Sequence, residues 1–199
     1  RIKAGVPVPM VETAIMTADG RFLPHDGEAQ GELVLRAPWL TQGYFREPQK
    51  GEELWEHGWL HTGDVATLDG MGFIDIRDRI KDVIKTGGEW ISSLELEDLI
   101  SRHPAVREVA VVGIADPQWG ERPFALLVLR DSAELDARGL KEHLKPFVEQ
   151  GHINKWAIPT QIALVTDIPK TSVGKLDKKR IRLDIAQWQA AGSTFLSTL

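Results

Sequence analysis

The stretch Ile76-Arg-Asp-Arg-Ile-Lys-Asp82 decides how this sequence is divided, because five of its seven residues are charged while apolar strands are expected on both sides. Charged side chains are rarely buried, so the segment is solvated on most of its faces. One interpretation is an exposed charged turn, and the other is a hinge that contacts a ligand. The expected secondary structure differs on the two sides, with short strands before the segment and alternating helices and strands after it. We therefore expect two domains, residues 1–78 and residues 79–199.

The part before this stretch is typical of a small all-β unit. Asp19-Gly20 and Asp69-Gly70 are turn signals of the kind that join neighbouring strands. The expected strands cover residues 11–17, 32–36, 64–68 and 73–76. Four short strands without a helical period predict a small β-barrel or a β-sheet unit.

The part after this stretch alternates helices with strands. Ser92-Ser-Leu-Glu95 fits a capping box and predicts a helix that ends near His103, before Pro104. Apolar residues at 140, 144, 147 and 148 predict a second helix, and a third is expected over 176–190. The expected strands cover residues 82–85, 106–114, 124–129 and 162–165. The order β-α-β-β-α-β followed by a helix is that of a ferredoxin-like α+β domain.

The composition excludes several classes of protein. With 42% hydrophobic and 27% charged residues the chain is ordinary for a globular protein, and it has no run of about 18 apolar residues that would predict a transmembrane helix. Cysteine is absent, which excludes disulfides, thiolate metal sites and cysteine nucleophiles. A net charge of -5 argues against a nucleic-acid partner. We expect a cytoplasmic protein, with peripheral membrane association as an open alternative.

The loop Pro169-Lys-Thr-Ser-Val-Gly-Lys175 resembles a phosphate loop only superficially. A Walker A motif requires Gly at position 169 and Ser or Thr at position 176, which here are Pro169 and Leu176. What remains is a loop of small residues in which Gly174 gives backbone freedom and Lys175 is a mobile positive charge just before a helix. The alternative is an ordinary solvated lysine.

Three further patterns are weighed against structural alternatives. Gly87-Gly88 allows a thin ligand to approach and Trp90 offers a flat apolar face, although a plain turn would also use these residues. Asp64 follows a glycine, where a carboxylate can hold a ribose diol or simply open the next strand. His57 and His61 are four residues apart, but no helical signal supports this spacing, so no metal site is expected in this chain.

Together and in this order, the motifs resemble the C-terminal third of the adenylate-forming superfamily, which includes acyl-CoA synthetases, luciferases and the adenylation domains of peptide synthetases. The resemblance extends over about residues 1–182. It is carried by Gly43-Tyr-Phe45, Trp59-Leu-His-Thr-Gly-Asp64, Asp78-Arg-Ile-Lys-Asp-Val-Ile-Lys85, Gly87-Gly-Glu-Trp-Ile-Ser92, Glu95-Leu-Glu97 and Pro169-Lys-Thr-Ser-Val-Gly-Lys175. The run at residues 87–93 is most similar to the medium- and long-chain fatty acyl-CoA synthetases, and the second domain would then be the mobile lid of that superfamily.

The resemblance implies a role for each candidate residue. Lys175 corresponds to the catalytic lysine of the first reaction step, and Lys81 to the hinge. ATP or AMP is expected to contact Asp64, Arg79, Lys81, Lys85 and Trp90, whereas CoA is expected to contact Gly87 and Gly88. Rotation about Lys81 would withdraw Lys175 and bring in the two glycines, so that one active site serves two reactions.

The implied reaction is the AMP-forming ligation of a medium- to long-chain fatty acid to CoA, with ATP and Mg²⁺ bound mainly upstream of this chain. Because the chain opens abruptly without an initiator Met, we expect a fragment that is inactive alone and whose partners are its substrates and the N-terminal domain of the same protein. A homodimer stays open. The alternative functions are an adenylation domain that loads a carrier protein and a non-catalytic α+β interaction module.

Overall fold

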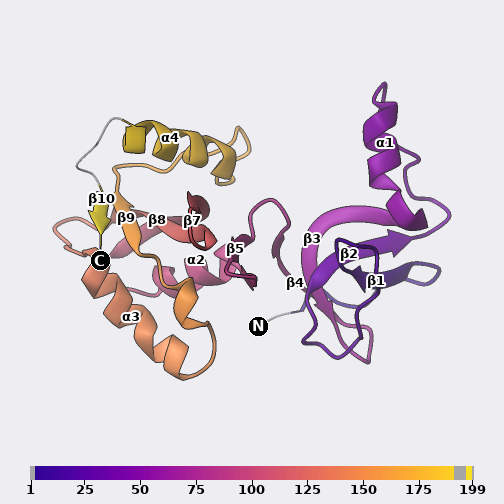
Figure 1. Ribbon diagram of the computed structural model, residues 1–199, viewed down its shortest axis with the longest axis horizontal. Helices are drawn as coiled ribbons and strands as arrows, with labels where there is room; N and C mark the ends of the chain where they lie inside the picture. Colours follow the sequence, from indigo (N-terminus) through magenta and orange to yellow (C-terminus); the bar gives the residue numbers. More distant parts are fainter. Residues whose placement is uncertain (1–2, 191–195, 199) are drawn as a thin grey trace. The chain divides into compact units, whose positions relative to one another are not determined.

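The computed structural model describes residues 3–190 and 196–198, and the chain divides into two compact units after Lys81 (Figure 1). The predicted domains were residues 1–78 and 79–199, whose outermost residues lie outside the described ones. The first unit extends beyond residue 78 because Arg79 pairs with Asp64 in its sheet. The predicted bounds of the two functional domains stay a prediction.

The N-terminal unit is a four-stranded antiparallel sheet in the order β1-β2-β3-β4. Its strands are β1 (Glu12–Met16), β2 (Gly31–Arg36), β3 (Leu60–Leu68) and β4 (Ile74–Arg79). Alternate residues face opposite sides of a strand, so Ile15 joins one apolar cluster while its neighbours Ala14 and Met16 join another. Within the described residues these strands do not close on themselves, so the sheet alternative is confirmed and the barrel alternative is wrong.

One short helical segment of this unit was not predicted. It comprises α1 (Pro48–Leu54) and the 3₁₀ turn η1 (Glu56–Gly58). The signal was Pro48 at the start of the helix, where its missing N–H costs nothing. Because α1 buries none of its residues, no apolar period announces it in the sequence.

The C-terminal unit contains all of the remaining helices and strands that the structure describes. They are β5 (Ile84–Thr86), β6 (Glu89–Ile91), α2 (Ser93–Ser101), β7 (Val106–Asp116), β8 (Gly120–Leu129), α3 (Ala137–Glu149), η2 (Lys155–Ala157), β9 (Gln161–Leu164), α4 (Lys178–Ala190) and β10 (Leu196–Thr198). The mixed α+β class is therefore confirmed, with β6, β10 and the short turn η2 as elements that the sequence analysis missed.

The centre of this unit is β8, which pairs antiparallel with β7 and parallel with β9. Alternate residues of β8 face two cores: Ala125 and Leu127 pack with α2 and α3, whereas Phe124 and Leu126 pack with α4. One strand departs from the ferredoxin-like arrangement. The short β5 forms its strand pairing mainly with β6, and its only ladder pair with β8 is Thr86 with Gly120.

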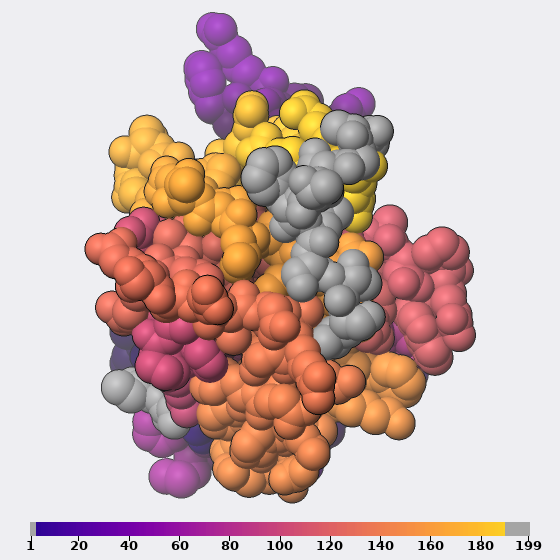
Figure 2. Space-filling view, turned by 90° about the vertical axis from the view of Figure 1, so that its left-hand side faces the viewer, coloured from indigo at the N-terminus to yellow at the C-terminus, as the bar shows by residue number. Residues whose placement is uncertain are grey.

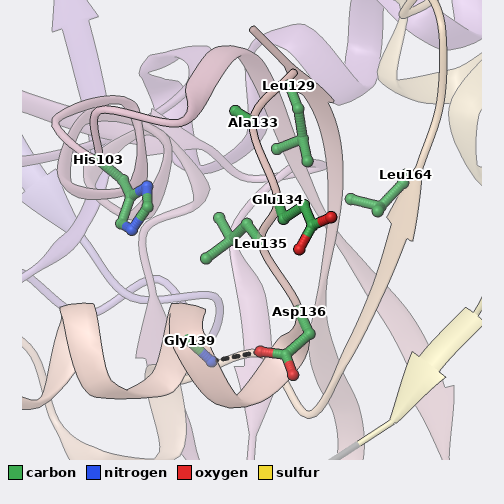
Figure 3. A pocket seen from close by; sticks show the side chains of 8 residues that line it. All are labelled: His103, Leu129, Ala133, Glu134, Leu135, Asp136, Gly139 and Leu164. Atoms are coloured by element: carbon green, nitrogen blue, oxygen red, sulfur yellow. Dashed lines mark hydrogen bonds between the residues drawn. The ribbon is translucent and has the colours of Figure 1, made fainter. Parts of the chain in front are cut away.

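Side-chain caps set the starts of the helices. The Ser92 hydroxyl accepts from the Glu95 amide at 3.2 Å, which confirms the predicted start of α2. The Asp136 carboxylate accepts from the Gly139 amide at 2.7 Å at the start of α3 (Figure 3). Asp177, expected inside the first turn of the last helix, instead lies before α4 and caps it through the Arg180 amide.

The three helices of this unit cover the sheet with their apolar sides. In α3, Leu140 and Leu144 are fully buried, as their spacing predicts, and Lys141 and Lys145 are exposed. Figure 2 shows the face of the molecule on which α3 lies at the surface. Across the described part of the chain, every helix is too short or too polar to span a lipid bilayer.

Candidate functional site

Lys175 lies on a tight hairpin that immediately precedes α4. Lys170 and Leu176 form a bridge at its base, and the Thr171 amide donates to the Lys175 carbonyl at 2.7 Å. Gly174 has a φ of 78°, a left-handed conformation that glycine adopts without strain. The hairpin therefore holds the backbone of Lys175 while its side chain is exposed to solvent.

An ion pair anchors the base of this hairpin to the sheet. The Lys170 ammonium lies 2.7 Å from the Glu108 carboxylate of β7, and this hydrogen bond raises the pKa of Lys170. Lys170 and Lys175 thus differ in their surroundings although both belong to the same loop. Lys170 forms an ion pair within the protein, and Lys175 is exposed to solvent.

The N-terminal unit brings Asp64 and Arg79 together. They are register partners on β3 and β4, and the Arg79 Nε lies 3.2 Å from the Asp64 Oδ1. Arg79 is exposed and the Asp64 side chain is 24% exposed, so both can still contact a ligand. Gly63, with a φ of 71°, turns the chain just before Asp64, and its carbonyl accepts from the Ile80 amide.

The β5–β6 hairpin unites four of the expected site residues. Gly87 and Gly88 form its two-residue turn, and their φ values of 57° and 89° are those of a hairpin turn that favours glycine at both positions. Lys85 and Trp90 are register partners beside this turn, with the Lys85 ammonium 5.6 Å from the centre of the Trp90 ring. The Gly-Gly pair between two apolar stretches was the signal that could have predicted β6.

Two residues that the sequence analysis missed support this turn. A Cβ atom on Gly87 would lie 3.0 Å from the Trp119 ring, and the Gly87 amide donates to the Trp119 carbonyl. Trp119 in turn packs on Trp156, with ring centres 4.9 Å apart. The Glu121 carboxylate accepts from the Lys85 amide at 2.9 Å. Lone tryptophan and glutamate residues carry no sequence signal for such contacts.

Lys81 is the last residue of the first unit and is exposed. The next residue, Asp82, is part of the second unit and pairs with Arg182 of α4 at 3.0 Å. A boundary between two compact units is where a hinge is expected. The structure describes each unit by itself, so the role of Lys81 as a hinge stays a prediction.

A buried charged cluster was also missed. The Lys178 ammonium lies 2.8 Å from the Glu97 carboxylate and 2.6 Å from the Ser93 hydroxyl, and all three residues are buried. The same Glu97 oxygen accepts from the Val111 amide of β7 at 2.8 Å. Lys178 is buried because α4 turns this side toward Ser93 and Glu97 of α2.

Other features of the surface do not coincide with these residues. A pocket of about 590 Å³ lies between His103, Leu135 and Leu164, and none of the expected site residues lines it (Figure 3). His61 is hydrogen-bonded to Glu32 at 2.7 Å. Among the residues that the structure describes, no three His, Asp or Glu side chains gather in a way that could hold a metal ion.

The comparisons with known proteins define the class first. Residues 95–175 match the family model of the AMP-binding enzyme C-terminal domain. The solved structure of ATP-bound MatB from Rhodopseudomonas palustris is 28% identical with a TM-score of 0.79, covering 92% of this chain and 35% of that one. The amide bond synthetase McbA from Marinactinospora thermotolerans is 35% identical with a TM-score of 0.76, covering 91% of this chain and 36% of that one. The chain belongs to the adenylate-forming superfamily, as its motifs predicted.

The curated relatives narrow the branch. A long-chain-fatty-acid–CoA ligase of Thermus thermophilus is 41% identical over 183 residues, which is 92% of this chain and 33% of the relative. A medium-chain-fatty-acid–CoA ligase of Ectopseudomonas oleovorans is 37% identical over 92% of this chain and 32% of its own length. The chain thus spans about a third of the length of the curated relatives it matches.

Proposed function

We propose that this chain is the C-terminal part of an AMP-forming acyl-CoA synthetase that activates medium- to long-chain fatty acids. The observation that carries the proposal is the exposed Lys175 on a preformed hairpin, in a chain about 40% identical to fatty-acid–CoA ligases. In the first step a carboxylate oxygen attacks the α-phosphorus of ATP and pyrophosphate leaves. In the second step the CoA sulfur attacks the carbonyl carbon of the acyl-adenylate, and AMP leaves.

Lys175 acts in the first step through its charge. The carboxylate, the α-phosphate and the departing pyrophosphate bring several negative charges together. An ammonium about 4 Å from one of them, at an effective dielectric constant of about 20, contributes roughly 4 kcal/mol. If the interaction forms mainly in the transition state, it accelerates adenylation by a factor on the order of 10³.

The other expected residues bind the nucleotide and CoA. In this proposal Asp64 accepts hydrogen bonds from the ribose hydroxyls, and Arg79 orients Asp64 and contacts the same nucleotide. Lys85 and Trp90 contact the nucleotide from the β5–β6 hairpin. After rotation about Lys81, the turn Gly87-Gly88 lines the path of the CoA thiol, where the absence of Cβ atoms leaves room for a thin chain.

The remaining machinery lies outside this chain in the proposal. The upstream part of the protein holds most of ATP and the acyl chain, and it is the first partner of the two units. Mg²⁺ would accompany ATP there, since the described residues offer no cluster that could hold it. We therefore expect no acyl-CoA from the 199-residue chain alone when it is mixed with ATP, Mg²⁺, CoA and a fatty acid.

The test is Lys175→Ala in the full-length protein, with the two half-reactions measured separately. Pyrophosphate release reports adenylation, and acyl-CoA formation from preformed acyl-adenylate reports thioester formation. We expect a loss on the order of 10³ in the first and little change in the second. Equal losses in both steps would overturn the assigned division of labour. The control is Lys179→Ala, which removes an exposed lysine of α4.

A second candidate differs in the acceptor. The amide bond synthetase McbA shares this fold at 35% identity, so the fold alone does not specify CoA. An adenylation domain that loads a carrier protein would keep the Lys175 effect on pyrophosphate release, yet its product formation would not depend on CoA. A non-catalytic interaction module would show no effect of Lys175→Ala on either step.

A further inference from the structure

The hairpin that presents Lys175 depends on one side chain, that of Thr171. Three hydrogen bonds converge on this residue. The Thr171 amide donates to the Lys175 carbonyl at 2.7 Å, the Thr171 carbonyl accepts from the Gly174 amide at 2.9 Å, and the Thr171 hydroxyl oxygen accepts from the Lys175 amide at 3.2 Å. Thr171 therefore holds both backbone polar groups of Lys175, its amide and its carbonyl.

The hydroxyl is needed because of the turn geometry. In a regular antiparallel pair, the Lys175 amide would donate to the carbonyl of the residue opposite. Here that carbonyl, on Thr171, accepts from the amide of Gly174, which has a left-handed φ of 78°. The Lys175 amide donates to the side-chain oxygen of Thr171 instead. Ser and Thr hydroxyls satisfy local backbone groups in this way.

The direction in which Lys175 leaves the backbone follows from these bonds. A lysine side chain has four rotatable bonds, so its own conformation does not fix the position of the ammonium group. Its Cα–Cβ vector is fixed only if its amide and carbonyl are both fixed. Around this point the Lys170–Glu108 ion pair holds the base of the hairpin on β7, so the turn itself is the remaining source of freedom.

We propose that Thr171 is a positioning residue for Lys175, whose hydroxyl sets the orientation of the lysine during adenylation. The inference rests on the proposed function, because it needs Lys175 to act in that step. It predicts an effect confined to adenylation, since thioester formation does not use Lys175. It also predicts that the hydroxyl, rather than the methyl group of Thr171, is the required feature.

The experiment compares Thr171→Val, Thr171→Ser and Ser172→Ala in the full-length protein. Valine keeps the shape and the backbone bonds but lacks the acceptor, serine keeps the acceptor, and Ser172 is the exposed neighbour in the same turn. Loss of one such hydrogen bond corresponds to about five- to tenfold. We expect Thr171→Val to lower kcat of adenylation by about that factor, with KM for ATP and thioester formation within about twofold of the parent. Thr171→Ser and Ser172→Ala should both stay within about twofold in adenylation.

A structural measurement accompanies the kinetics. Amide exchange at Lys175 should become faster in Thr171→Val and stay unchanged in Thr171→Ser, because only valine removes the acceptor. Full adenylation activity in Thr171→Val, or loss of the same size in Thr171→Ser, would overturn the inference. An equal loss in thioester formation would also overturn it. Lys175→Ala in parallel separates the two levels: if that variant retains adenylation, the proposed function fails, whereas if it loses adenylation and Thr171→Val does not, only the role of Thr171 fails.

Discussion

Replacing Lys178 by methionine is expected to destabilise the C-terminal unit by about 3–5 kcal/mol. The Lys178 ammonium lies 2.8 Å from the Glu97 carboxylate and 2.6 Å from the Ser93 hydroxyl. The Lys178 and Glu97 side chains are only 9% and 11% exposed. Methionine fills a similar volume but removes the charge, so the carboxylate of Glu97 stays buried without the Lys178 ammonium.

The magnitude follows from the distance and the burial. At 2.8 Å and an effective dielectric constant of about 20, two unit charges attract by about 6 kcal/mol. Much of this attraction offsets the desolvation of both groups, so the intact pair contributes little net stability. Removing one partner loses the attraction but keeps the desolvation cost of the other. For broken buried ion pairs this loss is about 3–5 kcal/mol, which is the magnitude expected here.

Urea unfolding of the 199-residue chain, together with amide exchange at Val111, measures this effect. Val111 is informative because its amide donates to Glu97. The control Lys179→Met changes an exposed residue of the same helix and should shift stability by less than about 0.5 kcal/mol. The double variant Lys178→Met/Glu97→Gln should be more stable than Lys178→Met alone, since the buried charge of Glu97 is removed together with that of Lys178.

Two results would refute this reasoning. One is a loss below about 1 kcal/mol in Lys178→Met, which is the magnitude of an exposed ion pair. The other is a double variant whose loss equals the sum of the losses measured for Lys178→Met and Glu97→Gln alone, because additivity would mean that the two side chains do not interact. Either result would show that Lys178 and Glu97 are not coupled as a buried ion pair.

Three further predictions concern pH and the two glycine turns. Burial, and then the neighbouring His143, lower the pKa of His103 below its ordinary value of 6.5. The unfolded chain therefore binds the proton more readily, so the free energy of unfolding should fall as the pH drops through about 6.5. His103→Asn should make the free energy of unfolding, measured in urea, depend less on pH between about pH 5.5 and 7.5. Gly174→Ala should lower adenylation several-fold, because alanine is strained at a φ of 78° by about 1 kcal/mol, while thioester formation from acyl-adenylate is spared; an equal loss in both would contradict the assignment. Gly87→Ala should show the opposite pattern in the same two assays, because its Cβ would lie 3.0 Å from the Trp119 ring, and a selective loss of adenylation would count against a role for this turn in CoA binding.

Local signals predicted a large part of the fold. The capping box at Ser92 placed the start of α2, and the spacing of Leu140 and Leu144 placed α3, because caps and helical periods depend on residues within one or two turns. The Gly174 position similarly marked the loop before the last helix. Helix α1 escaped because it buries nothing, and β6 escaped because its three residues are too few to show a period.

For the candidate site, local motifs identified the expected site residues but not the residues that support them. The residue types of Asp64, Lys85, Gly87 and Lys175 could be selected from their motifs alone. The residues that support them could not be selected. Trp119 contacts Gly87 only because the chain folds back just before β8, and the sequence showed Thr171 only as one residue of a loop. The pairing of Asp64 with Arg79 likewise follows from the register of β3 against β4, which no short stretch of sequence specifies.

The α+β class, the turn at which Lys175 is presented and the family to which the chain belongs were predictable from the amino-acid sequence. The burial of Lys178 beside its exposed neighbour Lys179, and the parallel pairing of β9 with β8, become visible only in the folded chain. The difference lies in the range of the interactions. Caps, turns and hydrophobic periods are settled among close neighbours, whereas the burial of Lys178 depends on Ser93, 85 residues away in the chain.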